Sequence, residues 1–230
     1  MSEQGLAPDE PVRDLLRRLA VFDTDLPGFE TEHAPADPVT LFTQWLGAAI
    51  TAGVPEPHVM SLATADAGGR PSSRMLICRD VEPQGRWFFA SSSISRKGRE
   101  LAARPHAALG FYWPRQGRQI RIRGQVTAAD AERSAADFLA RSPGSRAEGL
   151  VGHQSDVLAD PADQSAAITE ARARIAADPR LVAPAWTLYG LLAGEVEFWQ
   201  GDRDRHHIRL RYRRAGDDAS SEWGKERLWP

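Results

Sequence analysis

The chain has 230 residues, of which 42% are hydrophobic and 26% are charged, an ordinary composition for a globular protein. Its 29 basic and 31 acidic residues give a formal net charge of −2, which argues against a nucleic acid as a partner. The single cysteine, Cys78, excludes an internal disulfide and a cysteine-rich zinc site, and it fits a cytoplasmic protein. No apolar run approaches the roughly 18 residues that span a bilayer, so we expect no membrane partner.

Residues 1–36 are rich in Pro, Asp and Glu, and we predict that they form an arm with one short helix. Within residues 11–20, arginines and leucines lie at amphipathic spacing. This pattern favours a helix packed on the body of the protein over a targeting or membrane-surface helix. The remaining residues, 37–230, are expected to form the main domain.

The first helix of the main domain is predicted to begin at Asp37, with Asp37 as N-cap and Pro38 at the first helical position. Apolar residues then repeat at helical spacing over about four turns. They are Leu41, Phe42, Trp45, Leu46, Ala49 and Ile50. Gly53 and Pro55 end this helix.

From residue 58 the pattern changes to strands separated by turns. The alternating polar and apolar residues of Gln119-Ile120-Arg121-Ile122-Arg123 are typical of a strand with one buried face. Asp66-Ala67-Gly68-Gly69 and Pro83-Gln84-Gly85 are typical hairpin turns. The predicted strands lie near residues 58–65, 72–80, 86–92, 107–113 and 118–128.

A short helix should begin after Ser95 as its N-cap and end before Pro105. Helices are also predicted over residues 130–141 and 161–178, and residues 142–160, with Pro143, Gly144, Gly149 and Gly152, are predicted to be a loop. Strands should resume at 186–200, 208–214 and 222–228. Meandering strands without βαβ alternation predict a mainly β fold with peripheral helices (α+β), built on an antiparallel barrel.

Ser95-Arg96-Lys97-Gly98 could bind a phosphate, because a helix N-terminus offers free N–H groups and a partial positive charge. Arg74 on a neighbouring strand could add a bidentate contact. The alternative is a solvated basic helix start, and the motif alone slightly favours it. Gln154-Ser155 could bond a heterocycle or a phosphate, although turn chemistry is clearly the favoured explanation of this motif taken alone.

The C-terminal part places Arg205, His207 and Arg209 at alternate positions shortly after Trp199. On a strand these side chains would share one face and could meet an anionic or oxidisable ligand, with Trp199 as a flat wall. Neighbouring strand residues such as His206 and His207 point apart, and the remaining histidines show no ligand spacing. We therefore predict no metal site.

Taken together and in order, these segments resemble the pyridoxamine 5′-phosphate oxidase family, the flavin-dependent split-barrel oxidases. The resemblance covers roughly residues 37–230. It implies an antiparallel split β-barrel that binds FMN at the subunit interface of a homodimer. The segments that carry it are Ser61-Leu62-Ala63-Thr64, Arg70-Pro71-Ser72-Ser73-Arg74-Met75, Ser95-Arg96-Lys97-Gly98-Arg99-Glu100-Leu101, Arg118-Gln119-Ile120-Arg121-Ile122-Arg123-Gly124, His153-Gln154-Ser155, Glu197-Phe198-Trp199-Gln200-Gly201 and Arg227-Leu228-Trp229-Pro230.

The resemblance also implies roles for individual residues. Arg74, Arg96 and Lys97 match phosphate-binding positions. Arg205 and His207 match substrate-facing residues over the flavin; they are the implied catalytic residues, with His207 handling protons and Arg205 orienting the substrate. The other implied FMN contacts, some from the partner subunit, are Met75, Leu76, Ile77, Arg79, Ala90, Ser91, Ser95, Gln119, Gln154, Ser155, Trp199 and Arg209.

The positions that would hold a substrate phosphate depart from the family pattern. Arg141 and Ser145 match it, but Arg79 replaces a lysine and Asp137 replaces a tyrosine, which puts an anion where the phosphate would lie. At the flavin, Ala90-Ser91 replaces a Tyr-Thr pair. These changes resemble the flavin-dependent oxidases of phenazine biosynthesis, which oxidise reduced tricyclic phenazine carboxylates.

The implied chemistry is transfer of a hydride equivalent from substrate to FMN, with dioxygen as final acceptor and hydrogen peroxide as product. One hypothesis is an oxidase of a reduced phenazine carboxylate precursor. A second is a pyridoxine/pyridoxamine 5′-phosphate oxidase that makes pyridoxal 5′-phosphate. A third is a non-catalytic flavin-binding protein, because fold alone does not fix function. A purely structural protein would require the cationic sites to stay empty.

Overall fold

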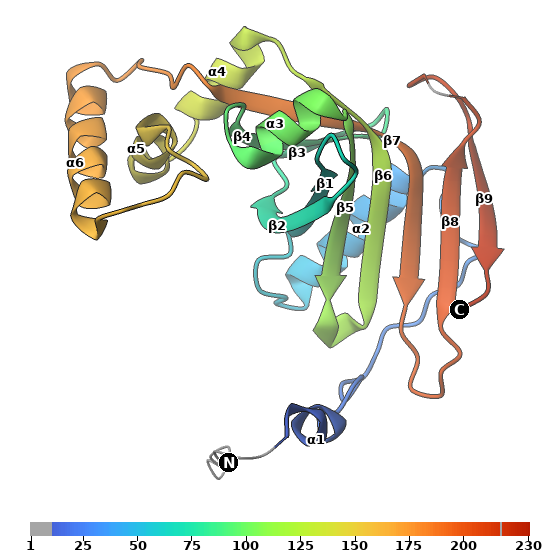
Figure 1. The fold of residues 1–230 in the computed structure, drawn as a ribbon. Helices are drawn as coiled ribbons and strands as arrows, with labels where there is room; N and C mark the ends of the chain where they lie inside the picture. The colour runs from blue at the N-terminus through green and yellow to red at the C-terminus, as the bar shows by residue number, and fades with distance from the viewer. Residues whose placement is uncertain (1–10, 217) are drawn as a thin grey trace.

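The computed structural model describes residues 11–216 and 218–230, which form a nine-stranded antiparallel sheet and six α-helices (Figure 1). The helices are α1 (Val12–Arg17), α2 (Pro38–Thr51), α3 (Arg96–Ala103), α4 (Ala131–Leu139), α5 (Pro143–Val151) and α6 (Pro161–Ala177). The strands are β1 (Val59–Ala65), β2 (Pro71–Ile77), β3 (Asp80–Glu82), β4 (Arg86–Ser92), β5 (His106–Trp113), β6 (Arg118–Ala128), β7 (Trp186–Gln200), β8 (Ile208–Arg214) and β9 (Trp223–Leu228).

Strand β7 organises the sheet, because it changes partner along its length. It pairs with β6 along almost all of its length. On its other edge, residues 186–192 pair with β4 and residues 195–200 pair with β8. The sheet therefore divides into two branches along β7 and curls (Figure 1). This confirms the predicted antiparallel split barrel with peripheral helices.

The division of β7 coincides with a β-bulge. The β6–β7 register shifts between Arg123 and Gly124, and Gly194 is the extra residue on β7. At Gly124 a Cβ atom would lie 1.9 Å from the carbonyl oxygen of Leu192, so no other residue fits there without backbone movement. Bulges of this kind bend a strand and increase its twist.

We expect Gly124→Ala to lower the free energy of unfolding by about 2–3 kcal/mol, because its methyl group would overlap the neighbouring strand. Gly194→Ala is the matched control, since the nearest atom to a Cβ there is 4.0 Å away. Urea unfolding of both variants measures the difference. Equal stabilities for Gly124→Ala and Gly194→Ala would contradict this account of the bulge.

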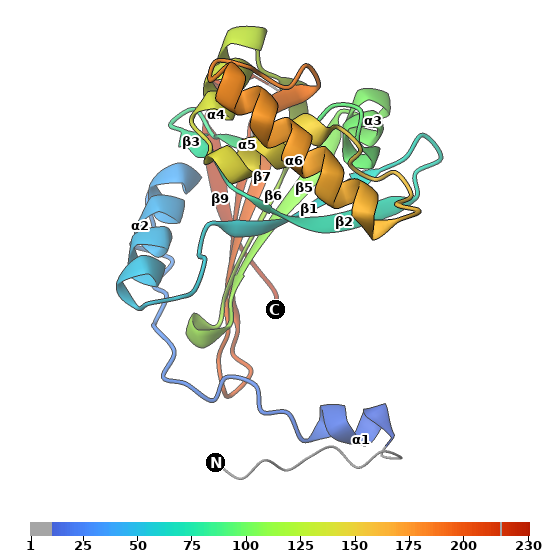
Figure 2. The same cartoon turned by 90° about the vertical axis from the view of Figure 1, so that its left-hand side faces the viewer.

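Helix α2 packs its apolar side against one face of the sheet (Figure 2). The side chain of Asp37 accepts a hydrogen bond from the Thr40 N–H at 2.8 Å, as predicted for the N-cap. Trp45 and Phe198 meet with ring centroids 5.1 Å apart. The predicted apolar face is thus confirmed as the contact between helix and barrel, except that Ile50, which was predicted to belong to it, is exposed.

Helices α4, α5 and α6 form a second small core at the end of the sheet where β7 begins (Figure 1). Helix α5 lies within residues 142–160, so the predicted loop is wrong over much of that segment. Ser142 caps the helix and Pro143 occupies its first turn, where proline is favoured. Gly149 lies inside the helix, where a Cβ atom would meet the ring of Phe138 at 3.1 Å. These residues are helix signals here, although the same types also mark loops.

Two further expectations need correction. The predicted strand 72–80 ends at Ile77, and the short strand β3 follows. Helix α1 forms in the arm, but none of its residues is buried, and it lies apart from the body of this chain (Figures 1 and 2). The expected packing of this helix on the body is therefore wrong.

Candidate functional site

A buried glutamate organises the cationic residues around the start of α3. Glu100 has a side chain that is only 4% exposed, and it accepts hydrogen bonds from Arg96 Nε at 2.9 Å and Arg74 Nη2 at 3.3 Å. Burial alone would raise the pKa of Glu100, but hydrogen bonds from Thr64, Ser72 and the two arginines lower it to about 2. Glu100 therefore stays ionised and fixes both guanidinium groups.

Lys97 lies beside this cluster and makes its hydrogen bonds to neutral groups. Its Nζ donates to Gln154 Oε1 at 2.8 Å, Ser91 Oγ at 3.1 Å and Ser95 Oγ at 3.3 Å. Burial of the ammonium and the nearby charge of Arg74 lower its pKa to about 8, with Glu100 opposing them. Three cations against one carboxylate leave net positive charge here, which fits an FMN phosphate.

The first turn of α3 depends on Ser95 and Gly98. Ser95 Oγ accepts a hydrogen bond from the Gly98 N–H at 3.3 Å, which confirms the predicted N-cap. A Cβ atom at Gly98 would lie 2.2 Å from the Ser93 carbonyl oxygen, so only glycine lets the helix start approach this turn. Ser155 accepts from the Arg96 N–H at 3.3 Å and has φ +83°. The structure thus brings Gln154 and Ser155 to the cationic cluster from 57 or more residues away.

FMN affinity should fall as pH rises above about 8, the pKa of Lys97 in the ligand-free chain. A bound phosphate dianion holds Lys97 protonated, so above this pH binding must take up a proton. Linkage then gives a loss of up to about tenfold per pH unit. Fluorescence titrations with FMN between pH 7 and 10 measure it, and Lys97→Arg, which stays charged, should flatten the dependence. A flat profile for the parent protein would contradict the assignment.

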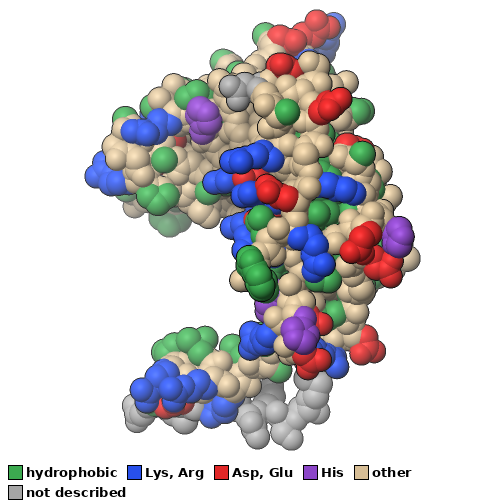
Figure 3. All heavy atoms as spheres, turned by 90° about the vertical axis from the view of Figure 1, so that its right-hand side faces the viewer, with side chains coloured by type: hydrophobic (Ala, Val, Ile, Leu, Met, Phe, Trp, Pro, Cys, Tyr) green, Lys and Arg blue, Asp and Glu red, His purple; other side chains and the backbone are tan. Residues whose placement is uncertain are grey.

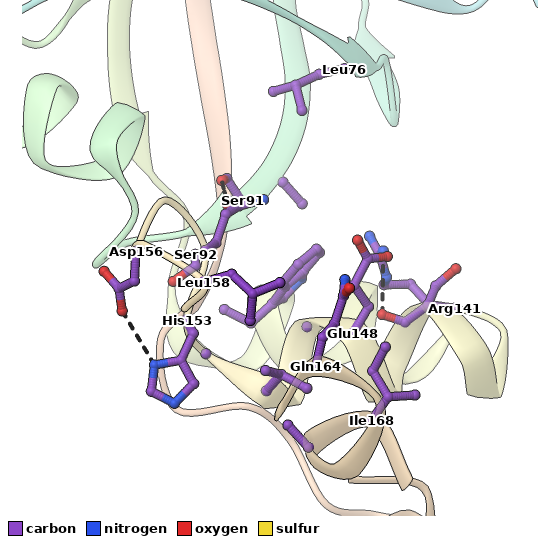
Figure 4. A pocket seen from close by; sticks show the side chains of 18 of the residues that line it. Leu76, Ser91, Ser92, Arg141, Glu148, His153, Asp156, Leu158, Gln164 and Ile168 are labelled. Atoms are coloured by element: carbon purple, nitrogen blue, oxygen red, sulfur yellow. Dashed lines mark hydrogen bonds and ion pairs between the residues drawn. The ribbon is translucent and has the colours of Figure 1, made fainter. Parts of the chain in front are cut away.

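Next to this cluster lies a cavity of about 910 Å³, lined by β2, β4, α5, α6 and residues 152–159 (Figure 4). Figure 4 shows Ser91 and Ser92 on one side of the cavity and Arg141 and Glu148 on another. The residues predicted to bind cofactor or substrate that line it are Met75, Leu76, Ile77, Arg79, Ala90, Ser91, Arg141, Ser145 and Gln154. Ser91 and Gln154 also contact Lys97, so the cavity and the cationic cluster are continuous.

The charges at the Arg141 side of the cavity are largely paired. Asp137 has a side chain that is 9% exposed; it accepts from Arg79 Nε at 2.8 Å and from Trp186 Nε1 at 2.9 Å. The predicted anion at position 137 is therefore present, but Arg79 neutralises it.

Arg141 stacks on Trp186, the second hydrogen-bond partner of Asp137. Its guanidinium carbon lies 4.2 Å from the centre of the Trp186 ring. Burial lowers the pKa of Arg141, as does the charge of Arg79, whereas Asp137 and Glu148 oppose the shift. Arg141 is the cation of this group that is available to a ligand, since it donates to the Ser145 carbonyl oxygen only over a long distance of 3.5 Å.

Other predicted FMN contacts lie in a second hollow of about 770 Å³ lined by residues of β1, β2 and β5 to β9. Gln119 and Arg209 line it, and Met75 lines both hollows. Arg209 donates to Glu197 Oε1 at 2.9 Å and Oε2 at 3.1 Å, and to the Trp229 carbonyl oxygen at 2.8 Å. Figure 3 shows basic and acidic side chains mixed over the face that carries β8 and β9, with a hollow between body and arm. In a single chain, the predicted FMN contacts therefore lie in two separate places, the cavity beside Ser91 and this second hollow.

The predicted common face of Arg205, His207 and Arg209 is wrong, because β8 begins only at Ile208. Arg205 is exposed in the preceding turn and has φ +67°. His207 does lie against Trp199, with ring centroids 4.9 Å apart, as expected. The turn replaces the strand because Asp202 Oδ1 accepts from the backbone N–H groups of residues 204 and 206, at 2.8 and 3.1 Å.

Sequence reasoning missed Glu100, Trp186 and Glu197 as parts of the site. Glu100 follows Arg96 by four residues, and this spacing on a helix was a signal for their ion pair. The hydrogen bond from Trp186 to Asp137 spans 49 residues and has no local signal in the sequence. Among residues 11–216 and 218–230, no cluster of three His, Cys, Asp or Glu is arranged to hold a metal. Across the same described part of the chain, no helix is long and apolar enough to cross a membrane.

Two family models match this chain. Residues 46–174 match the model described as pyridoxamine 5′-phosphate oxidase. Residues 186–230 match the model described as the pyridoxine 5′-phosphate oxidase C-terminal dimerisation region. The second match, which covers β7 to β9, supports a homodimer.

Individual relatives agree with these matches. The pyridoxine/pyridoxamine 5′-phosphate oxidase of Pseudomonas paraeruginosa is 40% identical over 205 residues, which cover 88% of this chain and 93% of the relative. The enzyme of that name from Thermosynechococcus vestitus is 41% identical over 198 residues, or 86% and 90% of the two chains.

Solved structures show the same fold. PhzG from Burkholderia lata, in complex with tetrahydrophenazine-1-carboxylic acid, superposes with a TM-score of 0.81 and 36% identity over 90% of this chain and 99% of that one. A pyridoxamine 5′-phosphate oxidase-related, FMN-binding protein from Nostoc punctiforme has a TM-score of 0.66 at 20% identity, covering 84% and 98%, which shows likeness of fold.

Proposed function

Since this chain belongs to the pyridoxamine 5′-phosphate oxidase family of FMN-dependent oxidoreductases, we propose that it oxidises a reduced phenazine carboxylate precursor in phenazine biosynthesis. Dioxygen is the final electron acceptor and hydrogen peroxide the product. The similarity to PhzG, whose structure holds a tetrahydrophenazine carboxylate, supports this substrate class.

Arg74, Arg96 and Lys97 would hold the FMN phosphate. Ser91 and Gln154, which contact Lys97, would reach the adjoining part of the cofactor from the cavity. Bound FMN would supply the ring that accepts the hydride equivalent. In a homodimer, Gln119, Trp199 and Arg209 of one protomer would complete the site of its partner, which would account for their place outside the cavity.

The observation that carries the substrate class is the balance of charge beside Arg141. Arg79 and Arg141 contribute two positive charges, and Asp137 and Glu148 contribute two negative ones. A phosphate monoester carries about −1.5 to −2 charges at pH 7 and would gain little attraction there. A ring with one carboxylate needs a single cation, and Arg141 against the flat face of Trp186 provides it. Ser145 would add a polar contact.

Arg205 and His207, at the C-terminal end of the fold, would act on the substrate from the partner subunit. Arg205 would orient an anionic group by charge. His207 would hydrogen-bond to the substrate through its ring at the point where protons are handled.

A second function, pyridoxine/pyridoxamine 5′-phosphate oxidase, is favoured by the 40% identity to the Pseudomonas paraeruginosa enzyme of that name. Arg141 and Ser145 are retained under this alternative. It requires a substrate phosphate to compete with Asp137 for Arg79.

The test is oxidation by the FMN-loaded protein of reduced phenazine carboxylates and of pyridoxine 5′-phosphate, followed as peroxide release. We expect turnover of the phenazine precursor and little of the pyridoxine phosphate. Efficient oxidation of pyridoxine phosphate at micromolar concentration would reverse the order of the two functions. Tight FMN binding without turnover of either substrate would favour a flavin-binding protein without catalysis.

A further inference from the structure

Phe22 is one of the points at which the arm contacts the body of the protein. Its ring centroid lies 5.9 Å from that of Trp199 and 5.8 Å from that of His207. The Trp199 and His207 rings are themselves 4.9 Å apart. Three rings from the arm, from β7 and from the turn before β8 therefore pack as one cluster.

Polar contacts fix the arm on both sides of this cluster. Arg203 donates to the carbonyl oxygens of Phe22 at 2.9 Å and Thr24 at 2.8 Å. Thr24 Oγ1 donates to the Arg115 carbonyl oxygen at 2.7 Å. These bonds join the segment of residues 22–26 to two turns that lie 91 to 181 residues away in the sequence.

Two glycines shape the surface that receives this segment. A Cβ atom at Gly201 would lie 2.7 Å from the Phe22 ring. A Cβ atom at Gly117 would lie 3.1 Å from the Leu26 side chain. A side chain at position 201 would force the Phe22 ring away, so the close approach depends on glycine.

The backbone of Phe22 has φ +57°, in the left-handed region. This conformation is unfavourable for a bulky residue and persists only where the surroundings hold it. The ring contacts and the Arg203 hydrogen bonds are what hold it here. Such strain is found preferentially at functional sites.

The same region fixes the tautomer of His207. The Asp202 N–H donates to His207 Nδ1 at 3.0 Å. Since Nδ1 accepts a hydrogen bond, the proton of the neutral ring must lie on Nε2. The ring therefore presents an N–H donor on the edge away from Asp202.

We propose that Phe22 is a positioning residue, through which the arm holds the Trp199 and His207 rings in place so that His207 directs its Nε2–H toward the substrate. This inference rests on the role of His207 in the proposed function. It gives residues 22–26 a part in the reaction without requiring them to touch the reacting atoms.

The test compares Phe22→Ala with Phe22→Tyr, which keeps the ring, and with Val21→Ala, which removes an adjacent side chain that is 62% exposed. The ring nitrogens of His207 are followed by NMR in FMN-loaded protein labelled with ¹⁵N-histidine and assigned by comparison with His207→Gln. Phe22→Ala should change the signal from the Nε2–H form to a mixture of tautomers and lower kcat at least tenfold, with FMN content unchanged. Phe22→Tyr and Val21→Ala should match the parent protein.

Arg203→Ala serves as a second variant in case Phe22→Ala folds poorly. It removes the two hydrogen bonds to the arm but leaves all three rings, and it should cause the changes in His207 signal and kcat expected for Phe22→Ala. Unchanged His207 signals in Phe22→Ala or in Arg203→Ala would overturn the proposal, even if kcat fell. The NMR measurement needs no substrate, and kcat is measured with whichever substrate is oxidised. A failure of the phenazine assignment is thus distinguishable from a failure of the proposal that Phe22 positions His207.

Discussion

Replacing Lys97 with methionine is expected to weaken FMN binding by roughly tenfold to a hundredfold. The loss reflects one charge-assisted hydrogen bond, worth about 1.5–3 kcal/mol. The same variant should make the FMN-free protein more stable, because it removes a buried ammonium whose pKa is lowered to about 8 by desolvation. Opposite changes in affinity and stability are typical of a residue kept for binding.

Arg99→Met is the control for this prediction, since Arg99 is an exposed cation on the same helix. FMN affinity is measured by quenching of flavin fluorescence, and stability by urea unfolding of the FMN-free proteins. Arg99→Met should bind FMN almost as tightly as the parent. If Lys97→Met also does so, the buried ammonium does not hold the phosphate and the assignment fails.

The second large effect is expected from Asp137→Asn, which releases Arg79 from its ion pair of 2.8 Å while keeping an oxygen that can accept from Trp186. The cavity then gains a net positive charge beside Arg141. Catalytic efficiency, kcat/KM, for pyridoxine 5′-phosphate should rise by roughly tenfold or more, the effect of one new charge-assisted contact.

Glu132→Gln makes the same change of charge at an exposed position on the same helix. It should leave kcat/KM for pyridoxine 5′-phosphate unchanged. Steady-state peroxide assays with both substrate classes separate a general electrostatic effect from a local one. No gain for the phosphate substrate in Asp137→Asn would show that Asp137 does not control the choice.

The parts of the fold that could be predicted are those with local causes. The N-caps Asp37 and Ser95 accept hydrogen bonds from the predicted helix starts. Alternation in β6 correctly buried Ile120 and Ile122. In α5, by contrast, Pro and Gly are compatible with either a loop or a capped helix, and only packing against Phe138 and Trp186 decides.

The candidate site was predictable as a set of residue types but not as a geometry. The family resemblance indicated Arg79 and Asp137 singly, whereas their pairing across 58 residues has no signature in the sequence. Likewise, the alternation of Arg205 and His207 with Arg209 was typical of a strand. The turn built on Asp202 decides otherwise, because its hydrogen bonds satisfy backbone groups that a strand would have paired with a neighbour.

The change of partner along β7 has a consequence for biosynthesis. Trp87 on β4 pairs with Leu191, about a hundred residues later in the chain. During translation, the edge of β4 that pairs with β7 therefore stays unpaired until residues 186–192, in the last quarter of the polypeptide, have left the ribosome. Unpaired strand edges invite association with other chains, so we expect β4 to be the segment that chaperones must shield in the nascent protein.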